Sequence, residues 1–195
     1  MKKLGFIVPY RDRRAHLPYF LNAVKGDIVI VEQEAGKPFN RAKLLNVGFL
    51  ESDFDYFVFH DIDMIPVGVD YSPSECAHLA GRASQFGGRL PYPTYFGGVT
   101  MFSRECFEVV DGYSNDFWGW GSEDDEMYNN VVGKGFIPEY RAGRFRSLPH
   151  KQADRSYHPE NIKRNLAGRL TGLKDCEYKV ISKIKTDYTW LKVSI

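Results

Sequence analysis

The sequence contains few cysteines. Only Cys76, Cys106 and Cys176 occur in 195 residues, and they are odd in number and widely spaced. This pattern argues against a disulfide framework and against a zinc knuckle, because both need paired cysteines at regular spacings. It favours a protein of a reducing compartment.

Long apolar runs are also missing. Near the N-terminus, one short apolar run at 4–8 follows two lysines and gives way to the charged segment 11–14. A signal peptide needs a longer apolar stretch, and a membrane-spanning helix needs about 20 apolar residues. We therefore expect neither a signal peptide nor a transmembrane segment.

The chain has almost no net charge. Its 26 basic and 25 acidic residues give a formal net charge of +1 at pH 7, so no global basic field attracts nucleic acid. With 43% hydrophobic residues, the chain suffices for one globular domain, with or without a small C-terminal appendage. Aromatic residues make up 15% of the chain, which suggests a binding surface.

Strand and helix patterns alternate in the first third of the chain. Apolar runs typical of buried strands are separated by segments with apolar residues at helical spacing, although Pro18 interrupts the first of these segments. This alternation predicts an α/β fold with a mostly parallel central sheet flanked by helices. The predicted strands are 4–8, 27–33, 56–63 and 97–103, the predicted helices are 13–24, 39–52 and 104–110, and residues 67–96 are predicted as loop.

Two aspartates follow the third predicted strand. Phe57, Val58 and Phe59 carry this strand into the core, and Asp61 and Asp63 come directly after it. Two residues apart on an extended chain, their carboxylates point to the same side. Such a pair at the carboxyl end of a strand suits Mg²⁺ or Mn²⁺ bound to phosphate. A D-x-D that only begins a turn is the alternative, and the buried strand before it favours the metal site.

Arginines and aromatic rings follow the first two predicted strands. Arg11, Arg13 and Arg41 fall in loops or first helical turns, where the phosphates of a nucleotide would lie. Guanidinium groups suit phosphate oxygens, and the rings of Tyr10 and Phe39 offer faces to a base. Each arginine alone is better explained as a solvated surface residue. Together they predict a nucleotide site.

Residues 118–126, WGWGSEDDE, place two tryptophans and two glycines before four acids. Ser122 is a good helix N-cap, and acids in a first helical turn complement the helix dipole, which accounts for part of the pattern. A tryptophan between glycines, such as Trp120, packs poorly in a core but makes a good mobile lid, because indole stacks on the apolar face of a sugar. We expect a sugar site in which one carboxylate acts as a general base.

Five motifs resemble those of the β-1,4-galactosyltransferase family, including its xylose-directed branch. The second and fifth are together highly specific, and the resemblance covers residues 4–150. The motifs are FIVPYRDR (6–13), FNRAKLLNVGF (39–49), FHDIDMIP (59–66), YFGGVTMFS (95–103) and NDFWGWGSEDDEMY (115–128). The resemblance implies a GT-A type nucleotide-sugar-binding fold, UDP-galactose as donor, Mn²⁺ with Mg²⁺ as the alternative, and inversion at the anomeric carbon.

The resemblance also implies roles for individual residues. Asp124 would deprotonate the acceptor hydroxyl, Trp120 would be the mobile tryptophan, and Tyr95 would crowd the C2 substituent of the donor sugar. The full set comprises Pro9, Tyr10, Arg11, Arg13, Phe39, Arg41, Asp61, Tyr95, Gly98, Trp120 and Glu123 for the nucleotide sugar, Tyr92, Trp120 and Asp125 for the acceptor, and Asp63 and His150 for the metal.

The chain departs from the family pattern at the metal site. In the segment 144–155, RFRSLPHKQADR, His150 is kept, but Ser147 stands where a Met or His ligand is expected. His158 is a weaker alternative to His150, and either histidine could instead be structural. With one protein ligand fewer, we expect weaker metal binding, with water completing the coordination.

The membrane anchor, stem and disulfides of the animal enzymes have no counterpart in the sequence. We therefore expect a cytoplasmic enzyme of bacterial or viral type, either soluble or peripheral at the membrane. A nucleotide-binding half at 1–66, an acceptor and catalytic half at 67–150 and a C-terminal extension at 151–195 would form one catalytic domain.

The expected activity is transfer of galactose to a glycan or glycolipid acceptor, with UDP-GalNAc or another UDP-sugar as the alternative donor. A non-catalytic sugar-binding module would not need Asp124 together with Asp61 and Asp63. A metal-dependent nucleotidyltransferase would need a glycine-rich phosphate loop, which PYRDR does not provide. The sequence does not identify the acceptor, whose site we expect residues 67–94 and 151–195 to flank.

Overall fold

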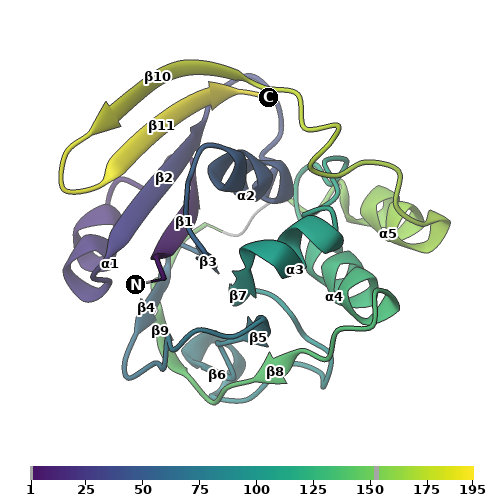
Figure 1. Ribbon diagram of the computed structural model, residues 1–195, viewed down its shortest axis with the longest axis horizontal. Helices are drawn as coiled ribbons and strands as arrows, with labels where there is room; N and C mark the ends of the chain where they lie inside the picture. Colours follow the sequence, from purple (N-terminus) through teal and green to yellow (C-terminus); the bar gives the residue numbers. More distant parts are fainter. Residues whose placement is uncertain (1, 152–153) are drawn as a thin grey trace.

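A mixed sheet of eight strands forms the centre of the molecule (Figure 1). The computed structural model describes residues 2–151 and 154–195. The strands β1 (Leu4–Tyr10), β2 (Asp27–Gln33) and β3 (Tyr56–His60) run parallel, with β1 between the other two. The strand order is β10-β11-β2-β1-β3-β7-β5-β8. The predicted parallel core of the sheet is therefore confirmed.

The sheet has a hydrophobic core on each face. Because successive residues of a strand point to opposite faces, Ile7 of β1 packs with α2 (Arg41–Leu50), whereas Phe6 and Val8 pack with α1 (Leu17–Ala23). All three side chains are almost completely buried. Helices on both faces were predicted from the alternating sequence pattern.

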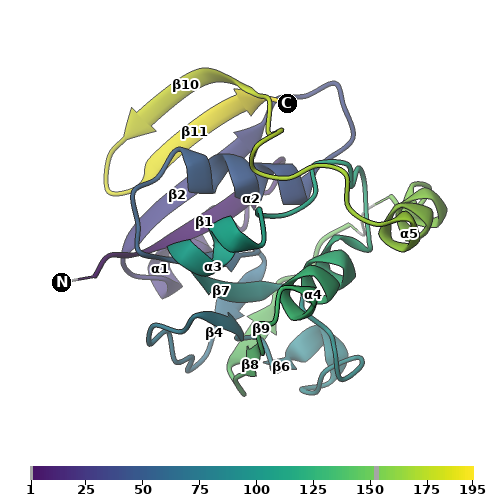
Figure 2. The ribbon, with the colours of Figure 1, turned by 45° about the vertical axis from the view of Figure 1, so that its right-hand side comes forward.

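Two further helices lie on the α2 side of the sheet. Buried residues of α3 (Arg104–Val109) and α4 (Glu123–Gly133) belong to the same core as those of α2, and Figure 2 shows the three helices on one face. α3 ends at Val109, and Asp111 and Gly112 just beyond it both have a positive φ. This layer brings the start of α4 close to the start of α2.

The predicted loop at 67–96 contributes a short strand, β5, to the main sheet, where it lies between β7 and β8. β7 (Val99–Ser103) pairs antiparallel with β3, β5 (Cys76–His78) pairs antiparallel with β7, and β8 (Glu139–Tyr140) pairs parallel with β5. The prediction of loop was wrong for β5, because a strand of three residues is too short for periodicity to reveal.

A second sheet brings distant segments together. It has three strands in the order β4-β9-β6, namely β4 (Met64–Pro66), β9 (Arg144–Ser147) and β6 (Arg82–Ala83), and the short 3-10 helix η1 (Ser84–Phe86) follows β6. Met64 lies opposite Ser147, so residues just before β4 face residues just after β9.

The extended conformation predicted for residues 61–63 was wrong. β3 ends at His60, and the chain then turns, with the Met64 N–H donating to the Asp61 carbonyl at 3.2 Å. The turn is what allows β4 to leave the main sheet and enter the second one. Asp61 and Asp63 therefore owe their positions to a turn and not to strand alternation.

The C-terminal segment completes the main sheet. After α5 (His158–Ala167), β10 (Lys179–Lys185) and β11 (Thr189–Ser194) form a hairpin, and β11 pairs parallel with β2. Leu191 of β11 is fully buried. The predicted extension at 151–195 is thus built into the central sheet.

Two helix starts and one helix cap differ in detail from the prediction. α1 begins at Leu17 and not at residue 13, because Pro18 fits the first turn of a helix. α2 begins after Asn40, whose side chain accepts the Lys43 N–H at 2.9 Å. Ser122 precedes α4 as predicted, but its φ of 73° is left-handed and its side chain makes no capping hydrogen bond.

The cysteines and the helices bear on the predictions about disulfides and membrane spans. All three cysteines are free, and Cys76 and Cys106 are buried. None of the helices in the described part of the chain has the length and apolar character needed to cross a membrane. The reducing compartment and the cellular location remain predictions.

Candidate active site

Arg41 lies at the centre of a cluster of carboxylates. Its Nε donates to Asp61 Oδ1 at 2.6 Å, and its Nη1 donates to Asp124 Oδ1 at 2.9 Å, with Glu123 Oε1 at 3.9 Å. The Arg41 side chain is only 11% exposed. The start of α2, the turn after β3 and the start of α4 therefore meet at one charged group.

Asn40 fixes the position of Arg41. It is fully buried, its N–H donates to Gln33 Oε1 at 2.9 Å, and its Nδ2 donates to the Asn115 carbonyl at 2.7 Å. These contacts join the end of β2 to the start of α2 and to the segment before residues 118–121, which we call the WGWG loop. Buried polar groups whose hydrogen bonds are made in this way stabilise a single arrangement of the backbone.

Asn46 holds the same segment from the middle of α2. Its Nδ2 donates to the Tyr113 carbonyl at 2.7 Å, and its Oδ1 accepts the Tyr113 N–H at 2.8 Å. A second acceptor for Nδ2 is Asn115 Oδ1 at 2.9 Å. α2 thus positions both the cation of the site and the approach to the WGWG loop.

Burial and neighbouring charges perturb the ionisable groups of the cluster. Burial, opposed by Arg41 and reinforced by Glu123, raises the pKa of Asp124 well above its ordinary value. Burial works against the charged form of Arg41, but Asp61 and Asp124 outweigh it and raise the pKa of the guanidinium. A carboxylate with a raised pKa, held beside a permanent cation, is suited to accept a proton.

One donor of Arg41 is left over. Nη2 is buried and has no hydrogen-bond partner among the described residues. An unmade hydrogen bond at a buried charged group is costly, so such a donor marks a place where a ligand oxygen would fit.

Asp63 and His150 form a second charged pair. His150 Nδ1 lies 2.9 Å from Asp63 Oδ2, as the pairing of β4 with β9 dictates. Burial, together with Asp61, raises the pKa of Asp63. Ser147 lies close by, but its hydroxyl donates to the Met64 sulfur at 3.6 Å.

This pair fits a divalent cation held by two protein groups. Within residues 2–151 and 154–195, no three His, Cys, Asp or Glu side chains form a metal-binding group. A carboxylate and an imidazole are both accepted by Mn²⁺, with phosphate or water oxygens filling the remaining positions. The structure places His158 beside Trp120 and not beside Asp63, so it is a poor substitute for His150. Residues 152–153 of the predicted metal segment lie outside the described residues.

His16 was missed by the sequence analysis. Its ring lies 6.2 Å from that of His150, and its Nε2 lies 3.3 Å from the Pro149 carbonyl. The residue is 8% exposed. Nothing in the local sequence pattern distinguishes it from a core histidine, because its partners come from a segment far along the chain.

The residues predicted to hold the nucleotide are partly brought together. The Arg11 guanidinium lies 5.2 Å from the centre of the Phe39 ring, and its Nη1 donates to the Lys37 carbonyl at 2.7 Å. Arg13 is partly exposed in the turn after β1. Arg41 instead faces the carboxylates.

The predicted role of the Tyr10 ring is not supported by its position. Tyr10 is 6% exposed and packs edge-on against Trp190 at 4.9 Å, and Pro9 beside it is buried. Its surface is covered by β11, whose pairing with β2 could not be read from the sequence. The Tyr10 ring is therefore not exposed to a nucleotide base in this structure.

Tyr92 and Tyr95 lie beside the carboxylates at the start of α4. The Tyr92 hydroxyl donates to Asp125 Oδ1 at 2.6 Å. Burial, reinforced by Asp124 and Asp61, raises the pKa of Tyr95, so its hydroxyl stays protonated and can donate. These tyrosines and carboxylates were all predicted as site residues.

Two glycines, Gly97 and Gly98, lie next to Tyr95 and Asp124. A Cβ at Gly97 would collide with Asp124 Oδ2 and with the Tyr95 hydroxyl. Gly98 has a φ of 81°, and its carbonyl accepts the Asp61 N–H at 3.0 Å. Gly98 was predicted as a site residue, whereas Gly97 was not.

A buried histidine contacts Gly97 and was also missed by the sequence analysis. His78 Nε2 lies 2.9 Å from the Gly97 carbonyl. Burial lowers the pKa of His78 to about 4, so the ring is neutral near pH 7 and can donate to that carbonyl. A single buried histidine in a short strand leaves no sequence signal of such a role.

α5 packs against the WGWG loop. Gly119 and Gly121 have φ values of 71° and 104°, and a Cβ at either would meet Tyr157 or His158. Asn161 is 2% exposed, and its Nδ2 donates to the Trp118 carbonyl at 3.0 Å and the Trp120 carbonyl at 3.3 Å. The glycines are therefore needed both for backbone conformation and for the close approach of α5.

The Trp120 ring is held on two sides. The Arg155 guanidinium lies 4.3 Å from its centre, and the His158 ring lies edge-on at 4.8 Å. The residue is still 38% exposed. A partly exposed indole beside the carboxylate cluster is placed to contact a sugar ring.

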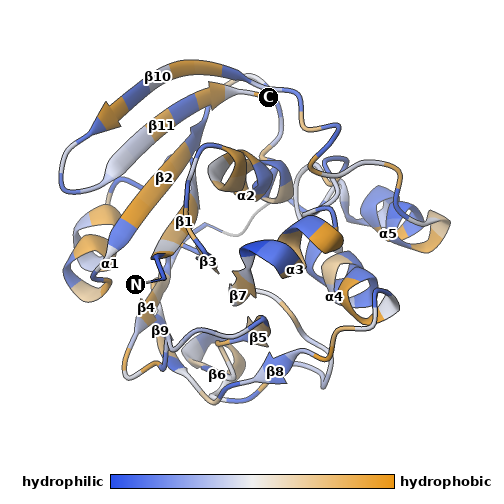
Figure 3. Ribbon diagram, in the orientation of Figure 1, coloured by the Kyte–Doolittle hydropathy of each residue, from blue (hydrophilic) through white to orange (hydrophobic). Residues whose placement is uncertain are grey.

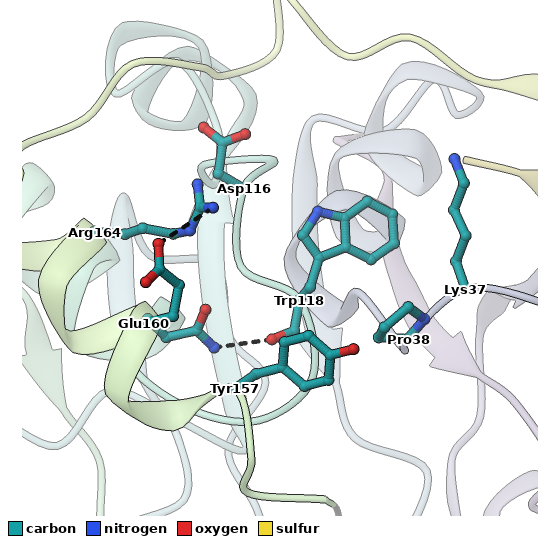
Figure 4. A pocket seen from close by; sticks show the side chains of 8 residues that line it. Lys37, Pro38, Asp116, Trp118, Tyr157, Glu160 and Arg164 are labelled. Carbon is teal, nitrogen blue, oxygen red and sulfur yellow. Dashed lines mark hydrogen bonds and ion pairs between the residues drawn. The ribbon is translucent and has the colours of Figure 1, made fainter.

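A cavity of about 360 Å³ lies between the WGWG loop, α5 and the segment before α2 (Figure 4). Trp118 and Tyr157 contribute rings to its wall, and none of the carboxylates around Arg41 lines it. Asn161 also lines the cavity, and its amide donates to the Trp118 carbonyl at 3.0 Å. The remaining lining residues are Lys37, Pro38, Asp116, Glu160 and Arg164.

Two family models match most of the chain. Residues 1–77 match the N-terminal region of glycosyl transferase group 7, and residues 77–151 match the N-terminal domain of galactosyltransferase. β-1,4-galactosyltransferase 1 of Mus musculus is 35% identical over 99% of this chain and 55% of its own length. β-1,4-galactosyltransferase 4 of Homo sapiens is 36% identical over 93% of this chain and 60% of its own length. The chain thus spans a little over half the length of these curated relatives.

Solved structures share the fold. A Drosophila β-1,4-galactosyltransferase 7 mutant in complex with manganese, UDP-Gal and xylobiose has a TM-score of 0.86 and 27% identity, with 100% of this chain and 94% of that chain covered. A Pyrobaculum calidifontis mannosyltransferase in complex with GDP-Man and Mn²⁺ has a TM-score of 0.55 and 14% identity, with 82% and 59% covered. These matches confirm the predicted GT-A type fold.

We predict that Asn161→Ala loosens the WGWG loop. The substitution removes both hydrogen bonds to the loop carbonyls, and leaving such groups unpaired costs about 1–3 kcal/mol. Amide hydrogen exchange measured by mass spectrometry should therefore speed up in residues 117–122. Asn165→Ala, one turn further along α5, is the matched control. Equal exchange in the two variants would show that Asn161 does not hold the loop.

Proposed function

The chain belongs to the β-1,4-galactosyltransferase family, and on that premise we propose that it transfers galactose from UDP-galactose to a hydroxyl of a glycan acceptor with inversion at the anomeric carbon. The observation that carries this proposal is the convergence of Asp61 and Asp124 on one buried arginine, with Tyr95 beside them. The manganese and UDP-Gal named for the Drosophila relative support the choice of cofactor and donor.

Asp124 is the proposed general base. It lies in the first turn of α4, and its raised pKa makes it a better proton acceptor than an ordinary aspartate. Arg41 stabilises its charged form through the 2.9 Å contact, so the carboxylate is ready to receive a proton. In the proposed reaction, the acceptor hydroxyl gives its proton to Asp124 as its oxygen attacks C1, and UDP departs from the opposite face.

Asp63 and His150 are the proposed protein ligands of Mn²⁺. When bound there, the metal would supply Lewis-acid neutralisation of the negative charge that develops on the departing diphosphate. Mg²⁺ would serve the same purpose with oxygen ligands. Arg11 and the unpaired Nη2 of Arg41 are cationic donors from the protein itself that suit oxygens of the nucleotide sugar.

The WGWG loop and α5 would keep water out of the site. Trp120 is held between Arg155 and His158, and Asn161 ties α5 to the loop. Excluding water favours transfer to an acceptor hydroxyl over hydrolysis of the donor. Tyr92 and Asp125, joined by a 2.6 Å hydrogen bond, are the proposed acceptor contacts. Xylobiose bound to the Drosophila relative makes a sugar acceptor the first choice to test.

A binding module without catalysis is the alternative of another class. It would account for the aromatic rings and for Arg11, but it would not need a buried carboxylate with a raised pKa beside Arg41. Another UDP-sugar as donor is the closer alternative. A cytoplasmic location, soluble or peripheral at a membrane, also remains our proposal.

We predict that Asp124→Asn abolishes transfer and leaves UDP binding nearly intact. Asparagine keeps an oxygen that can accept from Arg41 but cannot take a proton, and general-base catalysis typically contributes about 10²–10⁴-fold. Transfer rate and calorimetric UDP affinity should be measured in parallel, with the exposed Asp175→Asn as control. Transfer within about tenfold of the wild type, roughly 1.4 kcal/mol in barrier, would refute the assignment.

We predict that Asp63→Asn and His150→Ala each weaken Mn²⁺ binding. The loss should be at least about tenfold, because removing even an outer-shell partner of a metal site costs about 10–100-fold. Calorimetric titration of Mn²⁺ in the presence of UDP measures it, and exposed Asp70→Asn is the control. Unchanged titrations in both variants, or full activity after EDTA treatment, would contradict the metal site.

We predict that Tyr95→Leu relaxes the preference for UDP-galactose over UDP-GalNAc. The tyrosine ring would crowd an N-acetyl group at C2, and removing a steric exclusion of this kind changes discrimination by about tenfold or more. Rates with both donors should be compared, with exposed Tyr19→Leu as control and a thermal melt beside them. An early melt with equal loss of both activities would show that Tyr95 only supports the fold, and a wild type that favours UDP-GalNAc would overturn the donor.

A further inference from the structure

The outer face of the second sheet carries three arginines. Ala83 of β6 and Phe145 of β9 are almost completely buried, so the residues that alternate with them point away from the core. Arg82 lies opposite Arg144 in the parallel pairing of β6 with β9, and Arg146 is two residues further along β9. All three arginines are exposed. Figure 3 shows this sheet at the end of the molecule opposite the β10–β11 hairpin.

The three arginines line one cavity, which we call the arginine cavity. Its volume is about 300 Å³, and its other lining residues are Val67, Ser84, Gly88 and Phe145. Ser84 Oγ accepts the Ser147 N–H at 2.8 Å, which leaves the proton of its hydroxyl to donate. Within residues 2–151 and 154–195, the lining therefore offers three cations and a hydroxyl but no carboxylate.

The positive charge of the arginine cavity is not balanced by nearby acids. No Asp or Glu occurs in residues 64–69, 77–104 or 141–151, the segments that supply its walls. None of the three lining arginines forms an ion pair or a side-chain hydrogen bond with another residue that the structure describes. Their guanidinium donors are therefore available to a ligand.

Arg141 shows where the acids of the adjoining segments are used. It lies 3.8 Å from Asp70 and donates to both carboxylate oxygens of Glu139, at 2.9 and 2.8 Å. The remaining acid of these segments, Glu75, directly precedes β5 in the main sheet. These pairings leave the arginines of the second sheet with their full charge.

Three guanidinium groups suit a phosphate better than a carboxylate. A phosphate monoester carries a charge of about −1.5 to −2 at pH 7 and three strong acceptor oxygens, whereas a carboxylate has one charge and two oxygens. Guanidinium forks match such oxygens in pairs. A nucleic acid is a poorer match, because the net charge of the whole chain is only +1.

The arginine cavity adjoins the candidate active site. The 3-10 helix η1 follows Arg82, and the ring of its last residue, Phe86, lies edge-on at 5.3 Å from the Tyr95 ring. On the other strand, the chain runs from Arg146 through the end of β9 to His150, a proposed metal ligand. Two short segments therefore connect the cavity to the candidate sugar site and metal site.

We propose that the arginine cavity binds a phosphate group. On the proposed function, this phosphate belongs to the acceptor, because the diphosphate of the donor has Asp63, His150 and Arg11 as its proposed partners. Most of the lining residues also come from residues 67–94, which we expected to flank the acceptor site. The acceptor is then a phosphorylated glycan, whose phosphate the three guanidinium groups bind beside the sugar site.

Phosphorus NMR titration with inorganic phosphate, in EDTA and without UDP, tests the cavity. The wild type should bind phosphate, sulfate should compete because it has the same shape, and acetate should not; binding should weaken as salt is raised. Binding should be weakened at least about tenfold in the arginine variant, which combines Arg82→Gln, Arg144→Gln and Arg146→Gln. The matched control removes the same charge from exposed lysines elsewhere, by Lys25→Gln, Lys163→Gln and Lys185→Gln. Thermal melts should be unchanged, because all six side chains are exposed.

Three outcomes of this titration would overturn the proposal. These are no phosphate binding by the wild type, an equal loss in the lysine control, and equal competition by acetate, which would indicate only a charged surface.

Galactose transfer to xylobiose and to a xylobiose phosphate tests the link to the acceptor. The arginine variant should raise the KM of the phosphorylated acceptor alone, by at least about tenfold. Equal KM values for the two acceptors in both proteins would show that the acceptor does not carry the phosphate. Transfer to neither acceptor, with phosphate binding intact, would count against the proposed function and leave the phosphate site standing.

Discussion

One buried guanidinium holds the candidate active site together. Arg41 contacts carboxylates from the turn after β3 and from the start of α4, and all four side chains are at most 29% exposed. Taking such charges out of water is costly, and only their mutual contacts recover the cost. Removing Arg41 alone would leave Asp61, Glu123 and Asp124 facing one another, and breaking a buried pair in this way costs about 3–5 kcal/mol. The two carboxylate-bearing segments are therefore locked to α2 and to each other.

Buried asparagines extend this constraint into the fold. Asn40 and Asn46 join α2 to residues 113–115, and Asn161 joins α5 to the WGWG loop. The loop thus has one end fixed by the helix that carries Arg41 and its own carbonyls fixed by α5. Arg41 Nη2 has no partner among the residues that the structure describes. A ligand bound to it would contact a group that these hydrogen bonds link to the carboxylates, to the WGWG loop and to α5.

Features that repeat along the chain could be predicted from the sequence, and features that depend on distant pairing could not. The parallel strands β1 to β3 and the helix α2 follow from apolar periodicity. The resemblance of the motifs assigned Asp124, Asp63 and His150 to one site, and the structure has Asp63 in contact with His150. β5 is too short for periodicity, and the covering of Tyr10 depends on the pairing of β11 with β2. Gly97 and His78 are single residues whose partners lie elsewhere, so no local pattern marks them. α5 packs against the WGWG loop through the polar residues His158 and Asn161. An apolar pattern in the sequence would instead predict that the apolar side of the helix is buried.

The two residues proposed to hold the metal show how the pairing of two distant strands can keep side chains together when a neighbouring motif residue changes. Asp63 and His150 meet because β4 pairs with β9, with Met64 opposite Ser147, and the Leu148 N–H donates to the Asp63 carbonyl at 2.8 Å. Backbone pairing does not depend on the side chain at 147, so a serine there removes a potential ligand without moving His150. A cation held by only two protein groups must take most of its coordination from phosphate and water oxygens. On the proposed function, metal affinity at this site should consequently depend on the bound nucleotide as well as on Asp63 and His150, because phosphate oxygens would supply part of the coordination.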